Sequence, residues 1–224
     1  MNVQSGLSEP LGKNGTQRPE QTPAHKQTPL ELYYHNLDHK TLRPDPVQKK
    51  AIQSLDALYY DLISDKSKEP LSFLMRLKRV FCGSQMNRFN HAQGVYMHGG
   101  VGRGKSMLMD FFFSCLPPDI KKRRVHFHEF MIEVHAYLHE RRSADDAAIA
   151  ADEALPALAC RLSEATDVLC FDEFHVTDVA DAMILGRLFT ALFERGLHVV
   201  ATSNWPPERL YEGGLQRERF LPFI

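Results

Sequence analysis

One stretch decides the fold: Gly99-Gly100-Val101-Gly102-Arg103-Gly104-Lys105-Ser106. It matches the phosphate-loop pattern G-x-x-x-x-G-K-[ST] at every specified position. The apolar run at 95–97 predicts the strand that enters such a loop, and residues 106–112 predict the helix that leaves it. A Gly-rich turn that carries a lysine by chance would lack this context, so the stretch predicts a nucleoside triphosphate site.

The residue types in this loop suit a bound triphosphate. Its glycines allow backbone N–H groups to curl around the β- and γ-phosphates, and the start of the following helix adds its dipole. Lys105 is expected to neutralise phosphate charge, and Ser106 is expected to bind Mg²⁺. We therefore expect residues 99–106 to hold the nucleotide, with Ser106 as one metal ligand.

The composition is that of an ordinary globular protein in a reducing compartment. Hydrophobic residues make up 43% and charged residues 25% of the chain, and the formal net charge is −1. This charge gives no general reason to expect nucleic-acid or membrane binding. The cysteines are far apart and the N-terminus has no apolar signal segment, so we expect a cytoplasmic protein without a disulfide framework.

Three regions differ in composition. Residues 1–28 predict a disordered tail, because they have almost no large apolar side chains to offset the entropy of ordering. Residues 29–90 show helical apolar spacing, with a helix start at Asp45-Pro46, and are expected to pack on the core. Within them, the basic segment 73–81 fits a solvated helix face or a phosphate or partner contact. Residues 91–224 form the predicted nucleotide-binding core.

Strands and helices alternate after the phosphate loop. The sequence predicts strands at 124–128, 167–171 and 197–202, and helices at 129–142, 145–165 (interrupted near Pro156) and 179–195. Strands that are apolar on both faces imply a parallel sheet covered on two sides, hence a three-layer α/β/α fold. We expect the phosphate-loop strand to lie beside the strand that ends near Asn204, and that strand beside the one that ends near Asp172.

Polar side chains follow two of these strands. Asp172 would hold Mg²⁺ through water, and Glu173 would polarise the attacking water as general base. An acidic pair after a strand can also cap a helix, but the phosphate loop favours the catalytic interpretation. Asn204 could hydrogen-bond the γ-phosphate or the attacking water, and the structural alternative is an Asx turn before Pro206-Pro207.

The three motifs, in this order, resemble the AAA+ branch of P-loop ATPases. Longer strings resemble the AFG1/ZapE family: Gly94 to Ser106, Val125-His126-Phe127-His128-Glu129-Phe130-Met131, Leu169-Cys170-Phe171-Asp172-Glu173-Phe174, and Gln216 to Pro222. This resemblance runs from about Pro29 to Ile224. It implies a homo-oligomeric, ring-forming ATPase that uses ATP and Mg²⁺ to remodel or deliver protein substrates. The family acts on the FtsZ ring in bacterial division or in mitochondrial inner-membrane protein quality control, which allows peripheral membrane association.

The resemblance also assigns roles to residues outside the three motifs. Arg217 and Arg219 are candidates for the arginine finger that reaches a neighbouring subunit's nucleotide, with Arg219 favoured and a basic helix end as the structural alternative. Phe127 and Phe130 either contact substrate near a ring pore or pack in the core. An AAA+ module also needs a fifth strand and a helical lid, and because the sequence stops at Ile224 before either, we interpret it as a fragment with slow hydrolysis.

Other site types fit less well. His135 and His139 share a helical face, but Ala136 stands where the metalloprotease pattern needs Glu. The string Asp172-Glu173-Phe174-His175 imitates a DExH helicase box, but 202–204 do not form a Ser-Ala-Thr motif. Two alternatives stay open, an AAA+ helicase loader associated with DNA and a nucleotide-gated adaptor with little hydrolysis.

Overall fold

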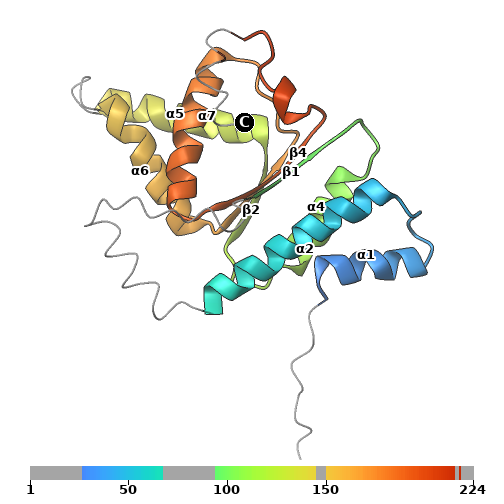
Figure 1. Ribbon diagram of the computed structural model, residues 1–224. Coiled ribbons are helices and arrows are strands. Elements are labelled where there is room, and N and C mark those ends of the chain that lie inside the picture. Colours follow the sequence, from blue (N-terminus) through green and yellow to red (C-terminus); the bar gives the residue numbers. More distant parts are fainter. Residues whose placement is uncertain (1–26, 68–93, 145–149, 215–216, 218–224) are drawn as a thin grey trace, which may run out of the picture.

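The computed structural model describes residues 27–67, 94–144, 150–214 and 217 (Figure 1). Most of the expected tail, the segment 73–81 and Arg219 lie outside these residues. The elements run α1 Pro29–Asp38, α2 Pro46–Ser67, β1 Gly94–His98, α4 Lys105–Cys115, β2 Lys122–His126, α5 Phe127–Ala144, α6 Ala150–Ala165, β3 Val168–Asp172, α7 Val179–Glu194, β4 His198–Ser203 and the short 3₁₀ turn η1 Pro207–Arg209.

The four strands form one parallel sheet in the order β1-β4-β3-β2. This order confirms the predicted neighbours of the phosphate-loop strand. The register places His98 beside Ser203 and His126 beside Asp172, so the strands end together at one edge. The loops that follow β1, β3 and β4 therefore meet at the carboxyl edge of the sheet, where α/β proteins bind ligands.

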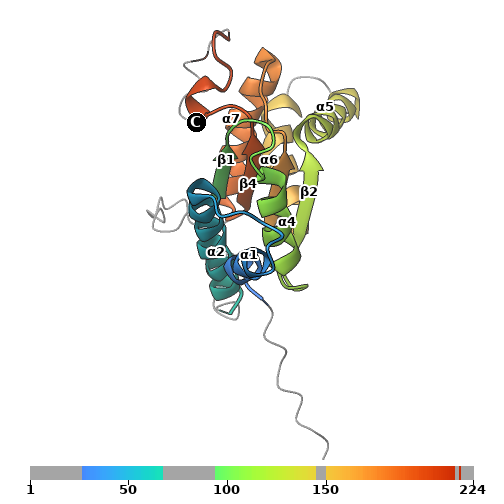
Figure 2. The same cartoon turned by 90° about the vertical axis from the view of Figure 1, so that its right-hand side faces the viewer.

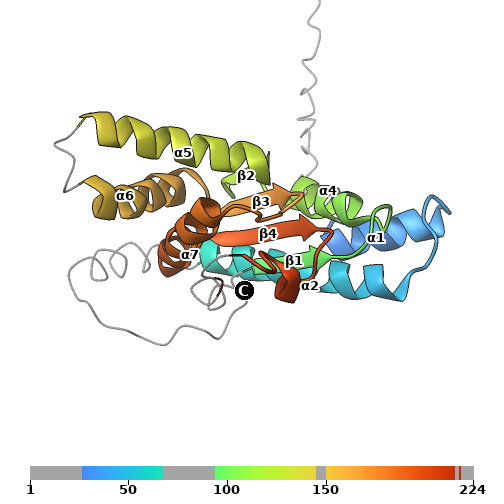
Figure 3. The ribbon, with the colours of Figure 1, turned by 90° about the horizontal axis from the view of Figure 1, so that it is seen from above.

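Helices cover both faces of the sheet, which confirms the three-layer α/β/α class. On one face α1, α2 and α4 lie together, and on the other lie α5, α6 and α7 (Figures 2 and 3). The inner strand β3 is buried along its whole length, whereas β1 and β2 are partly exposed because they form the sheet edges. Alternate residues of β3 thus enter two separate cores, Leu169 and Phe171 in one and Val168 and Cys170 in the other.

The first two helices have clear local causes. Thr28, placed by the sequence at the end of the tail, is instead the N-cap of α1 and forms a capping box with Glu31. Asp45 accepts a hydrogen bond from the Val47 N–H at 2.8 Å at the start of α2. Both helices then bury apolar side chains, among them Tyr33, Ile52 and Leu55, in one cluster with Phe112 of α4.

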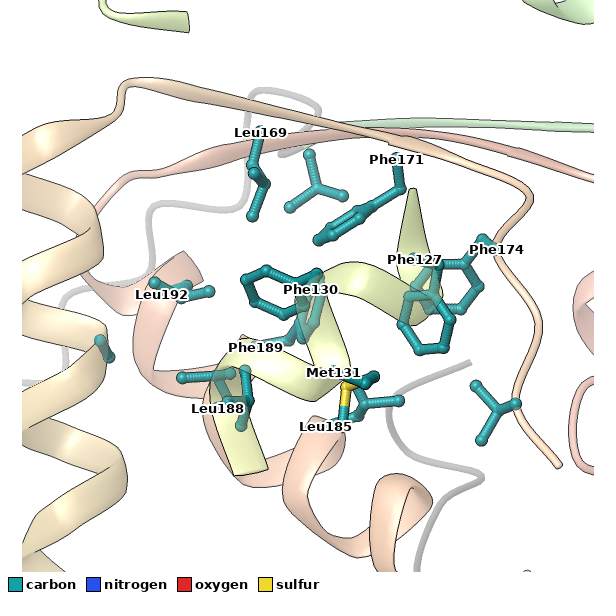
Figure 4. Close-up of a cluster of buried hydrophobic side chains, with 14 of the residues drawn as sticks. Phe127, Phe130, Met131, Leu169, Phe171, Phe174, Leu185, Leu188, Phe189 and Leu192 are labelled. Carbon is teal, nitrogen blue, oxygen red and sulfur yellow. The ribbon is translucent and has the colours of Figure 1, made fainter. Parts of the chain in front are cut away.

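The core between the sheet and α5–α7 is rich in aromatic rings (Figure 4). The ring centroids of Phe130 and Phe171 are 4.9 Å apart, and those of Phe127 and Phe174 are 4.4 Å apart. Phe127 is 3% and Phe130 1% exposed, so both are core residues. Both rings pack against Phe171 of β3, which favours the core interpretation over substrate contact.

The junction of β2 with α5 and the course of α6 differ from the prediction. The strand expected to reach His128 ends at His126, and α5 begins at the next residue. Phe127, Phe130, Met131 and Val134 repeat at helical spacing and fill one core, so burial favours helix there. Pro156 does not interrupt α6, because buried side chains on either side of it, such as Leu155 and Leu158, hold the helix against its neighbours.

Candidate nucleotide site

The phosphate loop joins β1 to α4 at the carboxyl edge of the sheet. Gly102 and Gly104 have φ angles of 76° and 82°, a left-handed conformation that favours glycine. A Cβ at Gly104 would lie 2.8 Å from Gln48 Nε2, so a larger residue there would displace the end of the Gln48 side chain. Gln48 in turn donates to the carbonyl of Arg103 at 3.1 Å, which braces the loop against α2.

Lys105 is the first residue of α4, and its side chain reaches back to the start of the loop. Its ammonium donates to the carbonyls of Gly99 at 2.6 Å and Gly100 at 2.9 Å, and to Asn204 Oδ1 at 3.0 Å. Partial burial lowers the pKa of this ammonium. The structure therefore brings together Lys105 and Asn204, which the sequence had placed on neighbouring strand ends.

The carboxylate of Asp172 lies at the end of β3 and is engaged by Arg124 of β2. Arg124 Nε lies 2.6 Å from Asp172 Oδ2, and its Nη2 lies 3.1 Å from Oδ1. Arg124 Nη1 also contacts Asp110 of α4. These hydrogen bonds, chiefly the one to Asp172, raise the pKa of Arg124, so its guanidinium carries a fixed positive charge.

Sequence reasoning missed Arg124. The signal was present in the alternation of β2, because Arg124 shares a sheet face with His126, the residue in register with Asp172. The signal identifies Arg124 only when the register between β2 and β3 is known, and that register cannot be derived from the sequence pattern. The brace from Gln48 was missed for a similar reason, since it joins residues 55 positions apart.

Glu173 has a constrained backbone. Its φ angle is 56°, a left-handed conformation uncommon for residues other than glycine. Its N–H donates to Thr202 Oγ1 at 3.3 Å, and the next N–H, of Phe174, donates to the Thr202 carbonyl at 2.7 Å. Ser203 Oγ donates to the Phe174 carbonyl at 2.7 Å. Strand β4 thus fixes the turn that presents the exposed Glu173 side chain.

A pocket of about 400 Å³ opens beside Glu173 and Asn204. It lies on the α5–α7 side of the strand ends, and His128 of α5 and Asp181 of α7 form part of its lining. The rings of His175 and Trp205 stack at 5.7 Å in its wall. The pocket provides space for water or a phosphate group next to the two polar side chains.

The oxygen ligands at this edge suit Mg²⁺. Ser106 at the start of α4 offers a hydroxyl and Asp172 a carboxylate, and Mg²⁺ is normally bound by one or two protein oxygens together with phosphates and water. Among the described residues, no group of three His, Cys, Asp or Glu side chains could hold a metal by itself. His135, weighed from the sequence as a metal ligand, lies in α5 with its Nε2 2.6 Å from Asp181 Oδ1 of α7.

The arginine-finger candidates are placed unequally. Arg217 Nη2 donates to the carbonyl of Glu208 in η1 at 2.5 Å, so its guanidinium contacts its own chain. Arg219 is outside the described residues. Both assignments stay predictions, as do the roles of residues 99–106, Asp172, Glu173 and Asn204.

A parallel α/β sheet with a phosphate loop after β1, an acidic pair after β3 and an amide after β4 defines a P-loop nucleotide-binding protein. Comparison of the sequence with family models gives the narrower class. The model of AFG1-like ATPases matches residues 27–224, and the chain belongs to that family. Among the described residues, no helix is both long enough and apolar enough to cross a membrane.

Related proteins come from bacteria and eukaryotes. The chain is 43% identical to the cell division protein ZapE of Escherichia coli, over 88% of this chain and 51% of that protein. It is 34% identical to an uncharacterized protein of Schizosaccharomyces pombe, over 96% of this chain and 51% of that protein. The chain therefore spans about half the length of these relatives.

The solved structures that the chain matches include two DnaA proteins. The chain is 21% identical to domain III of the Thermotoga maritima replication initiation protein DnaA, with a TM-score of 0.43 over 59% of this chain and 52% of that chain. For AMPPCP-bound DnaA from Aquifex aeolicus the identity is 12% and the TM-score 0.47, over 80% of this chain and 45% of that chain.

Proposed function

We propose that this chain binds ATP with Mg²⁺ and hydrolyses it to ADP and phosphate. The observation that carries the proposal is the convergence of Lys105 and Asn204 at 3.0 Å, on the sheet edge where β3 also delivers Asp172 and Glu173. Phosphate oxygens would replace the loop carbonyls as partners of the Lys105 ammonium. Backbone N–H groups of the loop and the start of α4 would bind the remaining phosphate charge.

Glu173 is the residue that we assign to water activation. Its side chain is exposed and lines the pocket together with Asn204, while its backbone is fixed by Thr202. A water in this pocket could donate to the Glu173 carboxylate and attack the γ-phosphate in line. Ser106 and Asp172 would hold Mg²⁺, which neutralises charge on the phosphates when it is bound.

We further propose that the active form is a homo-oligomeric ring in which a neighbouring subunit supplies an arginine. An arginine at the transition state is worth about 10³ to 10⁵ in rate. Arg219 is our first candidate, since Arg217 already donates to its own η1. We expect a ring to form from chains that are as long as the bacterial relative.

We propose the class of protein substrate by analogy with the relatives of this chain. The bacterial relative carries the name of a cell division protein, which favours a cytoplasmic role on a protein client such as FtsZ. A client of membrane-protein quality control, reached by peripheral membrane association, is the other protein substrate of the family. We propose no nucleic-acid partner, since the net charge is −1.

The test measures nucleotide binding and phosphate release separately. Fluorescent ATP binding with and without Mg²⁺ should be lost in Lys105→Ala, and phosphate release by a chain extended to the relatives' length should be lost in Glu173→Gln. Addition of FtsZ or single-stranded DNA to the same assay separates a protein client from a helicase-loader role. Stimulation by DNA alone, or tight ATP binding without any turnover, would overturn the proposal in favour of the loader or the adaptor.

A further inference from the structure

We propose that Arg124 is a positioning residue whose charge weakens the binding of a free divalent cation to the Asp172 carboxylate. The cation then binds there only together with a triphosphate. The inference rests on the proposed function, because it concerns the carboxylate assigned to Mg²⁺. It adds a residue from β2, a strand that carries none of the phosphate-site motifs. Three contacts of one guanidinium, described above, are its basis.

The first step is that Arg124 occupies both oxygens of Asp172. Nε and Nη2 bind Oδ2 and Oδ1 respectively, which fixes the plane of the carboxylate as well as its position. The side chain of Asp172 is 13% exposed and that of Arg124 24%, so water screens the pair only partly. A cation that approaches Asp172 without other ligands must compete with a fixed positive charge.

The second step concerns the opposite end of the guanidinium. Arg124 Nη1 binds Asp110, which belongs to α4, the helix that starts with Lys105 and Ser106. One side chain therefore links the helix of one proposed metal ligand to the strand of the other. Arg124 is the common partner of two carboxylates, and removal of its charge would leave Asp110 and Asp172 facing the same space.

The third step is the dependence on nucleotide. A triphosphate brings several negative charges and its own oxygen ligands, which offset the repulsion between Arg124 and a divalent cation. A free cation brings neither. Cation binding should therefore be weak in the protein alone and strong in its nucleotide complex. The charge of Arg124 is what lowers the affinity of the nucleotide-free protein for the cation.

The experiment titrates the nucleotide-free chain with Mn²⁺ and counts free Mn²⁺ by electron paramagnetic resonance. Arg124→Met should bind Mn²⁺ at least about tenfold more tightly than wild type, while Arg124→Lys, which keeps the charge, should stay close to wild type. The double variant with Asp110→Asn should bind Mn²⁺ more weakly than Arg124→Met alone. Arg124→Gln, also uncharged, replaces Arg124→Met if that variant does not fold.

Arg123→Met is the matched control. Arg123 is the neighbouring residue in β2 and pairs with Glu133 at 2.5 Å, so its loss removes an arginine–carboxylate pair away from the nucleotide edge. This variant should bind Mn²⁺ as wild type does. Equal Mn²⁺ affinity in wild type, Arg123→Met and the uncharged Arg124 variants would overturn the inference.

A second measurement separates this inference from the proposed function. Fluorescent ATP is titrated into wild type with Mg²⁺ and with EDTA. If Mg²⁺ strengthens ATP binding while the Arg124 variants do not change Mn²⁺ binding, only the role of Arg124 fails. If wild type does not bind ATP at all, the proposed function fails first.

Discussion

The ammonium of Lys105 donates to the side-chain oxygen of Asn204 at 3.0 Å, across 99 positions of sequence. The contact joins the start of α4, which follows β1, to the loop after β4, and β1 and β4 are neighbours in the sheet. It holds the ammonium of Lys105 beside the carbonyls of Gly99 and Gly100, where γ-phosphate oxygens can replace those carbonyls as hydrogen-bond acceptors. Asn204 is therefore in reach of any phosphate that Lys105 binds.

Replacement of Lys105 by Ala should abolish nucleotide binding, because the loop loses the ammonium that lies over the carbonyls of Gly99 and Gly100 and is expected to bind phosphate. At an ATP concentration of about 100 times the dissociation constant, the wild-type fold should gain about 2.7 kcal/mol of stability, and the variant none. Thermal unfolding with and without Mg²⁺·ATP measures this. Lys121→Ala, which removes an ammonium bound to the Glu164 carbonyl on the surface, should keep the full shift. An undiminished shift in Lys105→Ala would contradict the assignment.

Replacement of Glu173 by Gln should leave ATP bound but lower turnover by about 10²-fold or more, since general-base catalysis contributes about 10² to 10⁴. The amide keeps the size of the side chain and leaves the backbone contact with Thr202 in place. Phosphate release and ATP affinity should be measured on the same preparation. A variant that hydrolyses at the wild-type rate would exclude Glu173 as the base.

Thr202→Val should destabilise the turn that presents Glu173. The hydroxyl of Thr202 is buried and accepts from the Glu173 N–H, so valine leaves this donor without its partner. The free energy of unfolding should fall by about 1–3 kcal/mol in urea denaturation. Thr190→Val, which removes an exposed hydroxyl of α7, is the control and should change stability much less. Equal losses would show that the Thr202 contact adds nothing.

Phe130→Ala should cost about 3–5 kcal/mol of unfolding free energy, because it empties a site in the aromatic core. Ile132→Ala, two residues along α5 at a position 55% exposed, should cost little. Substrate-stimulated turnover per folded molecule should be unchanged in both. A Phe130→Ala protein of normal stability that fails to respond to substrate would restore the substrate-contact interpretation.

A shared active site can be tested by mixing inactive subunits of the longer chain. Glu173→Gln subunits lack the base but keep the arginine, and Arg219→Ala subunits have the reverse. Some interfaces of a mixed ring then contain both groups, so turnover should partly recover. Full activity of Arg219→Ala alone in an assembled ring would move the finger to Arg217 or elsewhere.

Local patterns were sufficient to predict that β1, β4 and β3 are neighbours in that order, and that Lys105 and Asn204 lie at one edge of the sheet. Each buried strand ends in a polar residue, and parallel strands joined by helices must present those ends at one edge. The end of β2 was mispredicted, because an apolar residue at position 127 fits the pattern of a strand and the pattern of a helix equally well. Arg124 could not be assigned because its partners, Asp110 and Asp172, come from elements whose relative positions depend on the whole fold.

The sheet divides the buried side chains into two clusters, and this division has a consequence for hydrogen exchange. Lys105 belongs to the helix packed on α1 and α2, whereas the turn at Glu173 rests on the aromatic rings beneath α5 and α7. Amides of α4 and of α5 can therefore exchange through separate opening events. A ligand that touches both loops would make these events cooperative, and the two layers would then open as a single unit.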